Sequence, residues 1–252
     1  MTIIRTISFI ILTMLLSQGA LAGGDAMFEK GLAAYQKQDI SKAVKHWKKA
    51  AKRENISAMY SLGLLNDQGK YIKQDLKEAE KWYSRAAKKG APQAQYQLGK
   101  LLAKKGDYDG AATWYGRSAK ADYARAQYEY ALLIEAGKGL TKNAEKAEYW
   151  LNKAGNNGSA PAQFKLVLMY MKGEGVEQNN EKAFTWAKAS SASGDANAKY
   201  LLGYMYYSGT GTVQSNEMAV IWLEDALVSG QAKAQQLLDI IAKEGDQQVS
   251  SL

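Results

Sequence analysis

The fold is decided by a stretch that spans residues 198–230 and reads AKYLLGYMYYSGTGTVQSNEMAVIWLEDALVSG. Its first half carries apolar residues at helical spacing, namely Ala198, Leu201, Leu202 and Met205, which predicts a helix over roughly 196–207. Gly209 is a typical helix-ending residue. Ser215, seven residues before Trp222, can accept a hydrogen bond from an unpaired N–H at a helix start. The stretch therefore predicts two helices joined by a glycine-rich turn.

The same pattern recurs along the chain, which indicates a repeat protein. An alanine returns at steps of 32 or 36 residues, at Ala26, Ala58, Ala94, Ala126, Ala162, Ala198 and Ala234. Two residues after each of the first six stands an aromatic residue, namely Phe28, Tyr60, Tyr96, Tyr128, Phe164 or Tyr200. Tryptophan recurs in one register at Trp82, Trp114, Trp150, Trp186 and Trp222. In the first unit His46, the only histidine, occupies the tryptophan position. We expect His46 to pack there rather than to catalyse a reaction.

The second helix of each unit has a recurring start signal. Seven residues before the tryptophan position stand Asp39, Asp75, Asp107, Asn143, Asn179 and Ser215, and all six side chains can cap a helix N-terminus. Pro92 and Pro161 lie where first helices are expected to begin, the one turn that tolerates proline. Glycines that follow second helices are typical helix ends and occur at Gly90, Gly158, Gly194 and Gly230.

A single helical hairpin cannot bury its apolar side, so the units must stack on one another. We therefore predict an all-α, right-handed superhelical α-solenoid over residues 23–243. The expected units are 26–57, 58–93, 94–125, 126–161, 162–197 and 198–233, followed by a capping helix at 234–243 and a flexible tail at 244–252.

Residues 1–22 are predicted to form a signal peptide rather than part of the fold. Arg5 supplies a basic start, residues 7–16 form a short apolar run, and Ala20-Leu21-Ala22 resembles a cleavage site. The apolar run is shorter than the roughly 20 residues of a membrane span. We expect cleavage near Ala22, a periplasmic or secreted protein, and no transmembrane segment in the mature chain.

Composition excludes several kinds of chemistry. The 252 residues contain no cysteine and one histidine, which excludes disulfides, thiolate sites and a multi-histidine metal centre. We expect no catalytic residue, cofactor or metal. Gly137-Lys138-Gly139, Gly173-Glu174-Gly175 and Gly209-Thr210-Gly211 lack the strand and the Lys-Ser/Thr pair of a phosphate-binding loop, so we interpret them as turns.

The repeated residues resemble a known family. Ala198, Tyr200, Leu202, Gly203, Tyr206, Gly209, Gly211, Ala219 and Trp222 match the Sel-one-like repeat (SLR), a 36-residue relative of the tetratricopeptide repeat, as do Gly173, Gly175, Lys182, Ala183 and Trp186. The resemblance covers about residues 26–243. It implies an interaction protein, and exported bacterial members act as adaptors in the cell envelope. A cysteine-rich subset is linked to β-lactam chemistry, but this chain lacks those cysteines.

In related tetratricopeptide solenoids the first helix of each unit lines a concave groove. The resemblance therefore implies a partner-binding site on these helices, formed by Tyr96, Lys100, Tyr128, Glu135, Phe164, Met171, Tyr200, Tyr204 and Tyr207. We expect a monomeric scaffold that binds a peptide or helix of a protein partner.

Two alternatives remain. Basic residues of the second helices could bind peptidoglycan or another anionic envelope polymer, and these are Lys45, Lys48, Lys49, Lys52, Lys73, Lys77, Lys81, Arg85, Lys88 and Lys89. Export makes nucleic acid an unexpected partner. A β-lactam or cell-wall hydrolase is the weaker alternative, with Glu129, Glu135 and Glu174 as candidate carboxylates.

Overall fold

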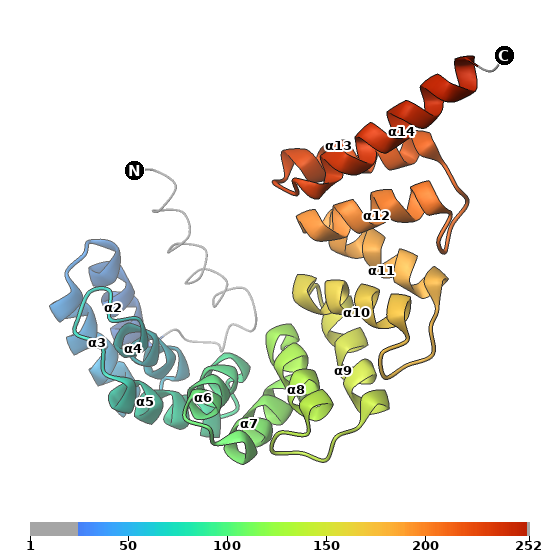
Figure 1. Cartoon of the computed structure of the whole chain (residues 1–252). Coiled ribbons are helices and arrows are strands. Elements are labelled where there is room, and N and C mark those ends of the chain that lie inside the picture. Colours follow the sequence, from blue (N-terminus) through green and yellow to red (C-terminus); the bar gives the residue numbers. More distant parts are fainter. Residues whose placement is uncertain (1–24, 251–252) are drawn as a thin grey trace. The chain divides into compact units, whose positions relative to one another are not determined.

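The computed structural model describes residues 25–250, and side chains up to Gly245. The predicted signal peptide therefore lies outside the described residues. Between residues 25 and 250 the chain forms thirteen helices and no strand (Figure 1). They are α2 (Ala26–Gln36), α3 (Ile40–Lys52), α4 (Ile56–Gln68), α5 (Leu76–Lys88), α6 (Pro92–Lys104), α7 (Tyr108–Lys120), α8 (Ala124–Ala136), α9 (Ala144–Asn156), α10 (Ala160–Lys172), α11 (Asn180–Ala192), α12 (Ala196–Ser208), α13 (Asn216–Val228) and α14 (Lys233–Ser250). The all-α solenoid prediction is confirmed.

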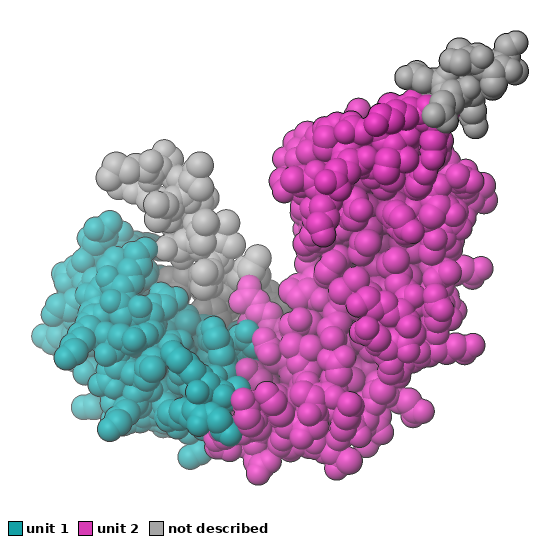
Figure 2. Space-filling model, viewed as in Figure 1, with its two compact units in different colours: residues 1–106 teal, residues 107–252 magenta. Residues whose placement is uncertain are grey.

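The chain divides into two compact units, with the boundary between Gly106 and Asp107 (Figure 2). In the N-terminal unit, α2 packs on α3 and α4 packs on α5, while α6 packs on α5. In the C-terminal unit, the hairpins α8–α9, α10–α11 and α12–α13 stack in chain order, with α7 against α8 and α14 against α13. The third expected repeat, 94–125, is thus shared between the two units.

The predicted helix starts are confirmed. All six predicted capping side chains accept a hydrogen bond from the backbone N–H three residues further on, at donor–acceptor distances of 2.7–3.2 Å. At the other end, Gly90, Gly158, Gly194 and Gly230 have positive φ angles, a conformation that glycine adopts without strain. Local sequence therefore fixes both ends of these helices.

The two helices of a hairpin approach each other through a small residue and a large one. An added Cβ would lie 2.4 Å from Trp47 at Gly31, 2.5 Å from Tyr83 at Gly63, and 2.7 Å from Leu223 at Gly203. In the α10–α11 hairpin the sizes are reversed. Val167 stands at the glycine position and Ala187 at the large position, and both are fully buried in one core cluster. The α10–α11 and α12–α13 hairpins thus place the same number of side-chain carbons at this contact but divide them differently between the two helices.

Neighbouring hairpins are joined by contacts that recur from repeat to repeat. Gln127 and Gln163, each following a repeat alanine, donate from their buried amides to a carbonyl near the end of the preceding second helix. Lys199 occupies the equivalent position in the last repeat, but it forms an ion pair within its own hairpin, with Asp225 of α13 at 2.8 Å. Trp186 packs in the same seam, since a Cβ at Gly155 of α9 would lie 2.7 Å from its indole.

The turn glycines also join repeats. A Cβ at Gly139 would lie 2.2 Å from the Tyr108 carbonyl oxygen, and a Cβ at Gly211 would lie 2.0 Å from the Asn180 carbonyl oxygen. Each turn therefore rests on the first residue of the preceding second helix, an approach that only glycine allows.

The C-terminal end is longer than the expected cap at 234–243, because α14 continues to Ser250. Ala234, Leu237 and Ile241 bury one side of α14 against α13. Beyond them, Glu244 accepts a hydrogen bond from the Tyr207 hydroxyl of α12 at 2.8 Å. No helix in residues 25–250 combines the length and the apolar character that crossing a membrane requires.

Candidate partner-binding groove

The first helices of the C-terminal unit form a groove of about 430 Å³ between α8, α10 and the start of α12. Its lining consists of Tyr128, Ala160, Pro161, Phe164, Lys165, Leu168 and Asp195, and we call it the Phe164 groove. Tyr128 and Phe164 occupy the same repeat position on successive first helices, and Leu168 lies one turn after Phe164. All three side chains are only partly buried, so their apolar surface faces the groove.

An ion pair forms part of the polar edge of the Phe164 groove. The Lys165 ammonium lies 2.9 Å from a Glu135 carboxylate oxygen and joins α10 to α8. Burial, followed by the nearby carboxylates of Glu129 and Glu135, raises the pKa of the Tyr128 hydroxyl. The phenol is therefore neutral at physiological pH. The groove offers an apolar floor, with the Lys165–Glu135 ion pair and the helix-capping carboxylate of Asp195 at its rim.

The structure brings together only part of the predicted site. Tyr128 and Phe164 line the groove, and Glu135 holds the Lys165 that lines it. Tyr96 and Lys100 lie on α6, which belongs to the N-terminal unit.

The remaining predicted residues lie elsewhere in the C-terminal unit. Met171 packs against the central core cluster, and Tyr200 and Tyr207 pack against the core beneath α14. Tyr204 is 39% exposed. The predicted site left out five residues that line the groove, namely Ala160, Pro161, Lys165, Leu168 and Asp195. The signal for Lys165 is its position directly after the groove residue Phe164.

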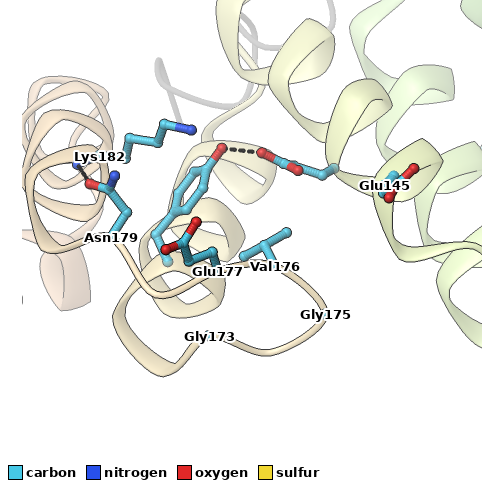
Figure 3. A pocket seen from close by; sticks show the side chains of 9 residues that line it. Glu145, Gly173, Gly175, Val176, Glu177, Asn179 and Lys182 are labelled. Atoms are coloured by element: carbon cyan, nitrogen blue, oxygen red, sulfur yellow. Dashed lines mark hydrogen bonds between the residues drawn. The ribbon is translucent and has the colours of Figure 1, made fainter.

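A second hollow, of about 500 Å³, lies where α9, α10 and α11 meet (Figure 3). The turn 173–177 forms its rim, and Glu145, Glu177 and Lys182 line it. The Tyr170 hydroxyl donates a hydrogen bond to Glu148, and burial together with this bond raises the pKa of Tyr170. This bond staples α10 to α9. In the next repeat the rings of Phe184 and Tyr206 join α11 to α12, with a distance of 5.2 Å between their centroids.

Of the candidate carboxylates of the hydrolase alternative, Glu129 and Glu135 both lie near Tyr128, whereas Glu174 lies in the turn after α10. Glu135 pairs with Lys165, while Glu174 in the turn pairs with Lys172 at 3.4 Å. Among the residues that the structure describes, no group of three His, Cys, Asp or Glu side chains has the arrangement of a metal site. Gly137, Gly173 and Gly209 end helices in the left-handed conformation, in agreement with their interpretation as turns.

A family model described as Sel1 repeat matches six stretches of the chain, at residues 16–55, 56–90, 92–123, 124–159, 160–195 and 196–226. Proteins built from Sel1 repeats are generally protein-interaction scaffolds and typically lack enzymatic activity. No curated protein matches the chain.

Solved structures share this architecture. The chain is similar to c5321, a protective antigen of uropathogenic Escherichia coli with an SLR fold, at 29% identity and a TM-score of 0.83, over 93% of this chain and 52% of that one. It thus spans about half the length of that antigen. It is also similar to a Sel1 repeat protein from Oxalobacter formigenes, at 26% identity and a TM-score of 0.74, over 83% of this chain and 88% of that one. The immunity protein PA5088 of Pseudomonas aeruginosa shares the fold, at 19% identity and a TM-score of 0.52, over 82% of each chain. With six matched repeats that cover most of its length, this chain belongs to the Sel1 repeat family.

Proposed function

We propose that this protein is a non-enzymatic scaffold that binds an apolar helix or peptide of a partner protein in the Phe164 groove. The observation that carries the proposal is the groove itself, where Tyr128, Phe164 and Leu168 remain partly uncovered beside a satisfied ion pair. Aromatic side chains are enriched in protein interfaces, and the volume lies within the range of pockets that hold bulky groups.

The groove is held by elements that do not need the partner. Phe164 and Leu168 project from one helix, α10, whose other side is buried in the central core. The Lys165–Glu135 pair ties that helix to α8. A groove formed before binding avoids much of the ordering cost of association, which favours capture of a short segment.

The test is site-specific crosslinking in the producing cell. A photoreactive phenylalanine analogue replaces Leu168 in one strain and Ile221 in another, because Ile221 of α13 is 51% exposed and lies outside the groove. We expect a crosslinked protein at Leu168 that is absent at Ile221. The purified partner should then bind Leu168→Glu at least tenfold more weakly than wild type, and Ile221→Glu as tightly as wild type. Equal crosslinking at both positions, or unchanged binding by Leu168→Glu, refutes the proposal.

We further propose that the protein acts outside the cytoplasm. The basic start, apolar run and small-residue site of residues 1–22 support this part of the proposal. Sequencing the N-terminus of the protein recovered from the cell envelope or medium tests it, and Gly23 is the expected first residue. A cytoplasmic protein that retains Met1 refutes export but leaves the groove proposal standing.

A further inference from the structure

The second helix of the first repeat, α3, carries a continuous cationic surface. Within Ile40–Lys52 there are five lysines and no acidic residue. At about 100° per residue, the five fall within about a third of the helix circumference. They are Lys42, Lys45, Lys48, Lys49 and Lys52, and together with Lys88 of α5 we call them the lysine face.

All six members of the lysine face are exposed. Among the described residues, none of them has a carboxylate within ion-pair distance. The nearest acidic residue after α3, Glu54, is held by Arg85 and Lys89 instead. The charge of the lysine face is therefore not neutralised by neighbouring acids.

Contacts between α3 and α5 place the sixth lysine beside the other five. The Arg85 guanidinium of α5 donates to the Ala51 carbonyl oxygen of α3 at 2.9 Å, so the C-terminal ends of these helices lie side by side. Lys88 is one turn further along α5 and corresponds to Lys52 in the repeat. The lysine face thus extends over two neighbouring helices rather than along one.

The fold does not require these lysines. Where α3 has Lys45, Lys48 and Lys52, the equivalent positions of α9 hold Tyr149, Asn152 and Asn156, and those of α13 hold Ile221, Glu224 and Val228. These helices nevertheless form the same hairpins. Like charges three and four residues apart also disfavour a helix slightly. Lys49, Lys52 and Lys88 lie in last helical turns, where a positive charge is favourable, but α9 and α13 show that the hairpin forms without lysine at the compared positions.

The asymmetry extends to the two units. Residues 25–106 contain 18 lysines and arginines and 8 acids, a net charge of +10, whereas residues 107–252 contain 14 and 17, a net charge of −3. The basic character of the whole chain is thus concentrated in one unit. A uniform charge for solubility would not require that concentration.

We propose that the lysine face binds the anionic surface of a phospholipid bilayer. Clusters of four to eight basic residues on a helix are typical of such surfaces, and each lysine near the surface contributes about 1 kcal/mol. Because the exposed lysines of the lysine face lie on two adjacent helices, they can contact several headgroups of a flat membrane surface at once. Neither α3 nor α5 exposes a large apolar side chain, so the contact is electrostatic and does not enter the acyl region. The absence of exposed rings on them also disfavours single-stranded nucleic acid, which needs stacking platforms.

The proposal is independent of the Phe164 groove and is tested by sedimentation of the full mature chain with vesicles. We expect co-sedimentation with vesicles of equal parts phosphatidylcholine and phosphatidylglycerol, little with phosphatidylcholine alone, and a steep loss in high salt. The variant Lys45→Gln/Lys49→Gln/Lys52→Gln should partition about a hundredfold more weakly. The control Lys120→Gln/Lys142→Gln/Lys146→Gln removes the same charge from exposed positions of the other unit and should bind like wild type.

Three results overturn the proposal. One is equal partition onto neutral and anionic vesicles. Another is an equal loss in both triple variants, which would reflect net charge alone. The third is retention on immobilised polyphosphate without vesicle binding, which would identify a soluble polyanion as the partner. Inorganic phosphate should displace the protein from vesicles no better than chloride of matched ionic strength, because single phosphates do not present a plane. Unchanged circular dichroism spectra of both variants exclude unfolding as the cause of a loss.

Discussion

The hairpin contact between Gly203 and Leu223 predicts a compensating double substitution. In Gly203→Val the new Cβ would lie 2.7 Å from Leu223 Cγ and 3.2 Å from the Ala219 carbonyl oxygen, and such overpacking costs about 1–3 kcal/mol. Leu223→Ala empties a fully buried site and costs about 2–5 kcal/mol. The double variant reproduces the arrangement of Val167 and Ala187 in the preceding hairpin and keeps the number of side-chain carbons. We expect it to be less destabilised than the sum of the single changes by about 1–3 kcal/mol.

The measurement is urea unfolding of the four proteins in this cycle, followed by far-ultraviolet circular dichroism. The matched control combines Gly203→Val with Leu151→Ala, because Leu151 is equally buried but belongs to the α8–α9 hairpin. Its two effects should add within about 0.5 kcal/mol. If the Gly203/Leu223 cycle is also additive within that margin, the two residues do not share one volume and the size-matching argument is refuted.

Three other outcomes follow from the structure. Gly158→Ala and Gly211→Ala both force alanine to a positive φ, but the new Cβ has open space at Gly158 and would lie 2.0 Å from a carbonyl oxygen at Gly211. Urea unfolding should show a loss of about 1–2 kcal/mol in unfolding free energy for Gly158→Ala and a clearly larger loss for Gly211→Ala. Equal losses would contradict the close contact at Gly211. Burial and a neighbouring tyrosine raise the pKa of Tyr35 to about 12, above its unfolded value of about 10. Its contribution to stability is therefore complete below about pH 10 and declines as the pH rises toward about 12. The pH profile of the unfolding free energy should be flatter in Tyr35→Phe, and an unchanged profile would count against the raised pKa. Asp225→Ala leaves the largely buried Lys199 without its carboxylate and should lower the unfolding free energy by about 1–3 kcal/mol, measured by thermal or urea unfolding. Adding Lys199→Gln to Asp225→Ala should recover part of that free energy. No recovery would show that the unpaired lysine is not the source of the loss.

The helix ends could be predicted from sequence because capping is a local interaction. Asp39 and its five counterparts satisfy an N–H only three residues away, and glycine at the other end needs nothing beyond its own backbone freedom. The family and the solenoid followed from the same periodic residues. None of this depends on contacts between distant parts of the chain.

The core register was harder to predict. The repeated tryptophan dominates the pattern, yet the fully buried residue is often the next one, such as Tyr83 after Trp82 or Leu223 after Trp222. Adjacent helical residues differ by only about 100° in direction, so periodicity alone does not decide which of the two faces the partner helix. Trp186 packs in the seam between hairpins, whereas the ring of Trp150 lies 5.5 Å from that of Tyr130 in its own hairpin.

The binding residues were predicted only in part because some depend on long-range contacts. The register placed Tyr128 and Phe164 on one face, and the structure brings them into one groove. Tyr207 looked equally available, but α14 extends past the expected cap and Glu244 engages its hydroxyl. No property of residues 198–207 indicates that contact, since it depends on where a later helix ends.

Size matching within hairpins also constrains how such a gene can change by recombination. A crossover in the turn between two hairpins transfers a complete small–large pair, such as Val167 with Ala187. A crossover between the two helices of one hairpin would join a valine to a leucine, or a glycine to an alanine, and leave a clash or a void. The inherited module is therefore the whole hairpin, and copies should be gained, lost or exchanged at the joints between repeats.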